Sequence, residues 1–290
     1  MTDLLAPYEF EFFRNGLAVA TIAGALCGLI GVFVVLRGMS FIGHGLSHAI
    51  FGGFAASTLL GVNLLLGAGA WGVASALLIN RVTRRGEIGA DAAIGVITTA
   101  SFAFGLALFA IFGGAGRGFD AALFGSILGV SGGDVATVAV VAVAAVALVA
   151  LRYRALLFTT FDAEVAEVSG VRTARVDALL MVVLAAAILA TMQVLGVTLV
   201  AAALVIPATV ARMLTTSFAR MLWLATGVGA ACGFVGMNLS YQLDVQSGPT
   251  IVLVGAALFA LVYLGRGQLA AASAIRQRWT SVSSSKPSRA

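Results

Sequence analysis

The sequence predicts an all-α polytopic membrane protein with eight or nine transmembrane helices and a re-entrant half-helix. Of its 290 residues 61% are hydrophobic and only 10% are charged, whereas about a quarter of a typical soluble protein is charged. A helical span needs about 20 apolar residues, so this length accommodates eight to ten spans with short connections. The 35 glycines also favour a bundle of transmembrane helices, because small residues let such helices approach closely. A soluble enzyme carried on a single anchor is excluded.

Nine apolar runs predict the spans, and each run ends where charged or turn-forming residues interrupt it. A tenth run, residues 119–130, has only twelve residues and is too short to cross a bilayer. Glycines flank it, so we expect a half-helix that is buried against the rest of the protein. The nine predicted spans are residues 15–36, 42–62, 65–80, 91–112, 133–151, 177–193, 196–212, 221–240 and 248–265.

The basic residues indicate the orientation. Two predicted spans separate each basic cluster from the next, so one side of the membrane collects 15 of the 17 lysines and arginines. By the positive-inside rule this side is the cytoplasm. We therefore predict an N-terminus outside and a cytoplasmic C-terminus. Residues 1–266 form the transmembrane domain, and residues 267–290 form a basic cytoplasmic tail that we expect to be disordered or to lie on the inner membrane face.

The only two histidines, His44 and His48, form a candidate transport site. A spacing of four places both imidazoles on one face of a helix, within reach of one metal ion. Polar side chains inside a membrane are costly and usually face a cavity or pathway, which favours transport over a structural role. Because glycines surround the pair, this helix either packs very closely or is broken, with its backbone carbonyls exposed to an ion.

Asp244 is the best candidate for a third ligand, because it interrupts two apolar runs and precedes Gly248 and Pro249. The alternative is an ordinary aspartate of an external loop, since the predicted topology places Asp244 near the outer surface and His44 near the inner one. Asp120, Asp134, Asn238 and Gln193 are weaker candidates.

Residues 152–177 form the longest polar stretch between spans and contain a predicted amphipathic helix. We expect Thr159 or Thr160 to cap this helix and Gly170 to end it. Acidic side chains near its positive N-terminal end would stabilise it. These acids are Asp162, Glu164 and Glu167. The apolar side chains of Phe158, Phe161, Val165 and Val168 are available for packing, so we expect the helix to dock on another subunit, although a solvated linker is the alternative.

Several function classes are excluded. The single lysine, Lys286, lies in the tail, so the chain has no phosphate-binding GxxxxGK[ST] loop and is not itself an ATPase. No hydrolytic triad or HExxH motif is present, and Cys27 and Cys232 lie in apolar runs where no disulfide framework or CxxC site exists. The positive charge follows topology, so no nucleic-acid partner is expected.

The chain resembles the membrane permeases of bacterial ABC importers for divalent metals, the ABC-3 metal permease family. Four stretches in the same order carry the resemblance, and it extends over nearly the whole chain. They are LRGMSFIGHGLSHAIFGG, LLFTTFDAEVAEVSGV, VTLVAAALVIPATVARML and LSYQLDVQSGPTIVL.

The resemblance implies a permease of the bacterial cytoplasmic membrane that works by alternating access. His48 stands at the family's signature histidine, His44 where many members have aspartate, and Asp244 at the late aspartate, positions thought to contact the metal. The segment with Phe161, Asp162, Glu164, Glu167 and Gly170 corresponds to the coupling helix. The implied partners are a second copy, an ATPase dimer that binds ATP, and an extracytoplasmic metal-binding protein, with no cofactor permanently bound.

Three alternatives remain open. Two imidazoles and a carboxylate suit manganese, zinc or iron, and affinity order alone does not select one. A proton-coupled transporter or a metal channel would need no ATPase, but it would be expected to bury several carboxylates as proton relays. An ABC permease for a metal chelate or a vitamin would share the partners and have a wide pocket without metal ligands.

Overall fold

A computed structural model of the chain describes residues 6–112 and 129–284, and within these ranges all regular structure is helical. Each of the nine predicted spans coincides with a helix. The predicted half-helix at 119–130 lies outside the described residues except for its last two. The elements are η1 Ala6–Glu9, α1 Glu11–Leu36, α2 Ser40–Leu60, α3 Leu64–Arg85, α4 Ala90–Phe112, α6 Gly132–Leu151, α7 Tyr153–Phe161, α8 Ala163–Val168, α9 Thr173–Leu195, α10 Val200–Leu214, α11 Phe218–Leu243 and α12 Ser247–Ser284.

Seven described helices are long and apolar enough to cross a membrane, namely α1, α3, α4, α6, α9, α11 and α12. The chain is therefore a multi-pass membrane protein. Two other predicted spans form helices that fall outside this set: α10 has only 15 residues, and α2 carries the two histidines and several serines among its apolar residues. The total of eight or nine spans stays a prediction.

The basic clusters lie at one end of the helix bundle, as the sequence predicts. Asp177, at the start of α9, forms ion pairs with Arg37 after α1 and Arg84 in the last turn of α3. Phe218, which begins α11, packs on Phe161 of α7. We call this the basic end. At the opposite end η1 meets the last turns of α11, where the Tyr8 hydroxyl donates to Asn238.

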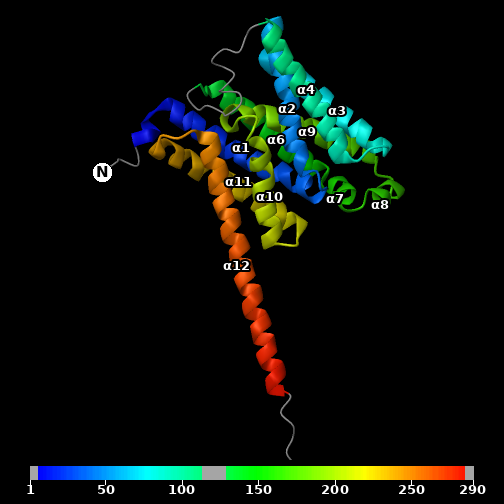
Figure 1. Cartoon of the computed structure of the whole chain (residues 1–290), viewed down its shortest axis with the longest axis vertical. Coiled ribbons are helices and arrows are strands. Elements are labelled where there is room, and N and C mark those ends of the chain that lie inside the picture. The colour runs from blue at the N-terminus through cyan, green and yellow to red at the C-terminus, as the bar shows by residue number, and fades with distance from the viewer. Residues whose placement is uncertain (1–5, 113–128, 285–290) are drawn as a thin grey trace, which may run out of the picture.

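Helix α1 runs through the centre of the bundle and packs directly on α11 (Figure 1). Glycines permit this contact: a Cβ at Gly24 would lie 2.1 Å from the Gly229 carbonyl oxygen, and one at Gly28 would lie 2.1 Å from that of Ala225. Neither position has room for a side chain. The pairing places two backbones against each other, as expected where small residues replace larger ones between membrane helices.

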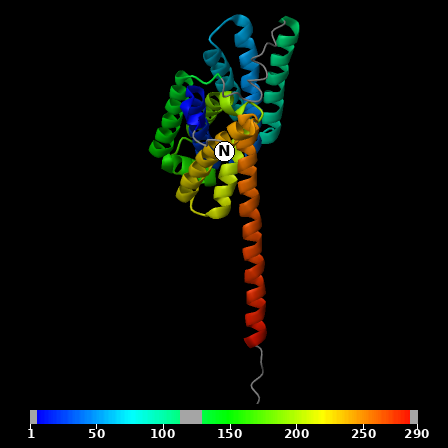
Figure 2. The same ribbon diagram turned by 90° about the vertical axis from the view of Figure 1, so that its left-hand side faces the viewer.

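Helix α12 leaves the bundle and extends alone beyond it (Figures 1 and 2). It continues to Ser284. Local composition permits this, because Leu, Ala, Gln and Arg, all good helix formers, predominate in the stretch LAAASAIRQRW, and the next proline is Pro287. The basic tail at 267–290, disordered or lying on the inner membrane face, stays a prediction.

Candidate metal pathway and coupling site

His44 and His48 lie together near the start of α2, with their Nε2 atoms 3.1 Å apart. The rings are perpendicular, and the edge of His48 also packs on Phe102 of α4. A transition metal bound by imidazole lies about 2.0–2.1 Å from nitrogen, so one ion bound to both Nε2 atoms would subtend roughly 100°. This angle lies between the octahedral and tetrahedral values. The distance therefore suits a shared ion, and in the absence of metal it also suits a hydrogen bond between the two rings.

The remaining nitrogens of the pair are accessible or unsatisfied. His44 is exposed on the surface of the single chain, and His48 is half-buried. Nδ1 of His48 is buried and has no hydrogen-bond partner among the described residues. A buried polar atom without a partner costs free energy, and the one side-chain hydrogen-bond contact of His48 among the described residues is the one between its Nε2 and that of His44.

Close packing fixes the position of α2. A Cβ at Gly45 would lie 2.7 Å from the Ile94 side chain, and one at Gly52 would lie 2.4 Å from the Ser101 carbonyl oxygen. Ser101 also donates to the Ala49 carbonyl at 3.0 Å. The expectation of very close packing is confirmed, and the alternative of a broken helix is wrong, because α2 is continuous from Ser40 to Leu60.

Asp244 lies at the opposite end, where it follows α11 with a φ of 53° and is exposed. Near Asp244, the Tyr241 ring of α11 packs edge-to-face on Phe13 of α1. Near the histidines, Gly43 of α2 and Gly31 of α1 both contact Leu204. Along α1, the 18 residues from Phe13 to Gly31 correspond to about 27 Å. Within the described ranges, no three His, Cys, Asp or Glu side chains come together. The structure thus joins the histidines to each other but not to Asp244, and the three-ligand site stays a prediction.

The weaker candidates have other roles or lie outside the description. The Asp134 carboxylate accepts from the backbone and the hydroxyl of Ser131, which makes it part of a capping box at the start of α6. Asn238 accepts from Tyr8 and donates to the Phe234 carbonyl. Asp120 and the side chain of Gln193 are not described.

The predicted docking helix is two helices, α7 and α8, joined at Asp162. The Asp162 carboxylate accepts from the Val165 backbone N–H at 2.9 Å and caps α8. The expected cap at Thr159 or Thr160 is wrong, because both hydroxyls donate to carbonyls inside α7. Asp162 is the N-cap instead, because its backbone is extended, as N-cap geometry requires. The segment ends at Gly170, as predicted, with a left-handed φ of 86°.

Helix α8 and the last residue of α7 present a largely exposed surface at the basic end. Glu164 and Glu167 are exposed, and so are the apolar side chains of Phe161, Val165 and Val168. Only Ala166 of this helix is buried. A six-residue helix with an apolar and acidic outer face has little reason to persist alone, which favours docking over a solvated linker.

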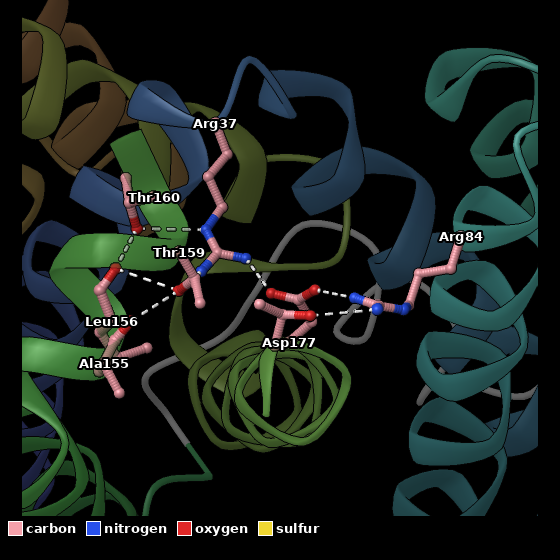
Figure 3. A network of polar contacts seen from close by, with 8 residues as sticks. Arg37, Arg84, Ala155, Leu156, Thr159, Thr160 and Asp177 are labelled. Carbon is pink, nitrogen blue, oxygen red and sulfur yellow. Dashed lines mark hydrogen bonds and ion pairs between the residues drawn. The ribbon is translucent and has the colours of Figure 1, made fainter. Parts of the chain in front are cut away.

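A polar network at the basic end connects α7 to the helix that carries the histidines (Figure 3). Arg37 lies three residues before α2. Its Nη1 contacts Asp177 at 2.7 Å, its Nη2 donates to Thr159 at 2.9 Å, and its Nε donates to Thr160 at 3.3 Å. Arg84 contacts the other Asp177 oxygen at 2.7 Å. The network thereby fixes α7 relative to the start of α2.

The sequence does not predict this network. The pattern of basic residues indicates only which side they share, and the apolar run indicates only a span that begins at residue 177. One indication was available: Asp177 is a lone carboxylate that enters a span directly after a basic cluster. Such a charge is costly unless it is paired.

A bundle of membrane-length helices with a histidine pair on one helix and a short exposed helix at the basic end is typical of a polytopic membrane permease. The chain belongs to the ABC 3 transport family, whose family model matches residues 9–266.

Curated relatives and a solved structure agree with this assignment. The manganese transport system membrane protein MntC of Halalkalibacterium halodurans is 35% identical over 88% of this chain and 87% of its own length. The "Probable iron transport system membrane protein" of Haemophilus influenzae is 34% identical over 89% of this chain and 95% of its own. The structure of PsaBC from Streptococcus pneumoniae in complex with Fab has a TM-score of 0.81 and 31% identity, covering 90% of this chain and 94% of that one.

Proposed function

We propose that this chain is the permease subunit of an ATP-driven importer that moves a divalent transition metal across the bacterial plasma membrane by alternating access. The observation that carries the proposal is the 3.1 Å separation of the His44 and His48 Nε2 atoms on α2. Relatives named for manganese and iron transport support it.

Two ligands from one helix suit transit rather than storage. A closed set of four ligands would hold an ion too tightly to release it, whereas conduction requires weak or stepwise binding. His44 is exposed on the single chain, so water, a second copy or a delivering protein can complete the coordination. Asp244, near the opposite end, would contact the ion at a different stage or in a different conformation.

The metal is a first-row divalent ion. The related proteins are named for manganese or iron, and imidazole also suits zinc. His44 stands where the resembling family often has aspartate, so its nitrogen ligand shifts preference away from the hardest ion. We expect the choice between manganese and its competitors to depend on residue 44.

The partners follow from exposed surfaces. We expect α8, with Glu164 and Glu167 exposed, together with the exposed Phe161 at the end of α7, to dock on a cytoplasmic ATPase that binds and hydrolyses ATP. The chain itself would then act without an ATP site. A second copy would cover the exposed stripe of α2 that includes Phe41 and His44. An extracytoplasmic metal-binding protein would deliver the ion at the opposite end.

A proton-coupled transporter is the second candidate, and the carboxylates argue against it. Such a protein would be expected to bury unpaired acids along its pathway. Asp177 is held by two arginines at the basic end, Asp244 is exposed, and Asp134 caps a helix.

Uptake of radiolabelled metal in a strain without its own importers tests the proposal. His48→Ala should abolish most uptake while the ATPase still co-purifies, and Asp244→Asn should lower uptake in the same assay. His44→Asp should retain uptake and favour manganese over zinc. Thr58→Ala is the matched control, because Thr58 is exposed on the same helix and away from the pair. Normal uptake by His48→Ala would remove the histidine pair from the pathway.

A further inference from the structure

A second candidate binding site lies at the basic end, away from the histidines. A cavity of about 430 Å³ opens where α6, α7 and the start of α9 meet. Three arginines line it, namely Arg152, Arg172 and Arg175. Its remaining lining includes the apolar side chains of Leu148 and Leu179. The lining therefore combines three cationic side chains with apolar ones.

The three arginines have no counter-charge. Arg37 and Arg84 are bound by Asp177, but Arg152, Arg172 and Arg175 form no ion pair or side-chain hydrogen bond with any described residue. No carboxylate lines the cavity. Two acids of the same end are committed elsewhere, because Asp162 caps α8 and both Asp177 oxygens face arginines. Three like charges around one cavity repel one another, so an anion there would be favoured.

The apolar wall continues into the membrane-spanning part of α6. Val140 and Ala144 precede Leu148 at intervals of four residues, which places the three on one side of the helix. Val140 and Ala144 are exposed on the single chain, and Leu151 beside them is 82% exposed. An uninterrupted apolar row thus leads from the cationic cavity along the span.

We propose that this cavity binds the headgroup of an anionic phospholipid from the cytoplasmic leaflet, with an acyl chain lying along Leu148, Ala144 and Val140. Guanidinium groups bind phosphate oxygens in a bidentate manner, and basic pockets at the cytoplasmic ends of membrane helices suit anionic headgroups. A soluble anion would use the arginines but would leave the apolar row uncovered.

The position of the cavity gives the lipid a structural consequence. Gly170 and Val171 line the cavity and connect α8 to α9. A bound headgroup would therefore contact the linker at the base of the docking helix. This inference goes beyond the proposed transport function, and lipid binding is measured without any transport.

Native mass spectrometry of the full chain, titrated with phosphatidylglycerol, tests the proposal. Replacing Arg152, Arg172 and Arg175 together with glutamine should weaken binding roughly a hundredfold, because each arginine contributes about fivefold at an anionic surface. The matched control replaces Arg81, Arg85 and Arg154 with glutamine, since these are exposed arginines of the same end that do not line the cavity. The control should bind phosphatidylglycerol as the unchanged chain does.

Three results would overturn the proposal. Equal binding by the two triple variants would show that the cavity arginines are not the site. Displacement of the lipid by soluble glycerophosphoglycerol at equal concentration would show that the ligand is a free phosphate ester and that the apolar row is not used. Loss of ATPase co-purification with unchanged lipid binding would identify the cavity as a protein contact.

Discussion

Asp177 offers the sharpest test of how the basic end is held together. The two ion pairs found among the described residues both use its carboxylate, and the side chains are 10% exposed in Arg37, 17% in Asp177 and 36% in Arg84. In Asp177→Asn the shielded Arg37 guanidinium would keep only neutral acceptors. Removing one partner of a buried pair costs about 3–5 kcal/mol, and the residual exposure places this case near the lower value, at about 3 kcal/mol. Arg84→Ala breaks a more exposed pair and should cost less than about 1 kcal/mol.

Equilibrium unfolding of the purified chain in detergent micelles, followed by helical circular dichroism, measures both costs. The assembled importer gives a second measurement, the ATP hydrolysed per metal ion transported. We expect this ratio to rise in Asp177→Asn, because the network that fixes α7 relative to the start of α2 is lost, and to change little in Arg84→Ala. If Asp177→Asn is no less stable than Arg84→Ala, neutral hydroxyls satisfy Arg37 and the ionic argument fails.

Three further predictions follow from other parts of the chain. Replacing Glu164 and Glu167 with lysine reverses the charge of α8, so ATPase co-purification should fall, at a cost of several kcal/mol for unpaired charge in an interface; unchanged coupled hydrolysis would make the segment a linker. A cysteine at Gln242 should react with an impermeant reagent from outside and one at Ser284 only after the inner face is opened, and the reverse pattern would invert the orientation. Gly229→Leu should separate α1 from α11 and abolish folded protein in membranes, since even a Cβ there would lie 2.0 Å from the Gly24 carbonyl oxygen; normal accumulation would contradict the packing.

The sequence by itself determined the features that depend on local composition and spacing. Apolar runs of membrane length gave all nine predicted helices, because burial in lipid requires an internally hydrogen-bonded helix. The four-residue spacing brought His44 and His48 together, since helical periodicity alone places them on one face. Counting the spans between the basic clusters predicts that they share one side of the membrane, and this topology stays a prediction. The four ordered stretches were enough to indicate the ABC-3 family.

Tertiary structure decided which distant residues meet. The sequence does not show that Asp177 pairs with Arg37, 140 residues earlier, that Gly24 faces Gly229, or that three unpaired arginines surround one cavity. The sequence also does not show that Asp244 and the histidine pair lie at opposite ends of the bundle, because the depth of a residue depends on how the helices are packed and tilted. Local patterns set the length and faces of each helix through backbone hydrogen bonding and side-chain period. Contacts between helices arise from shape and charge complementarity across the whole bundle, which no single segment specifies.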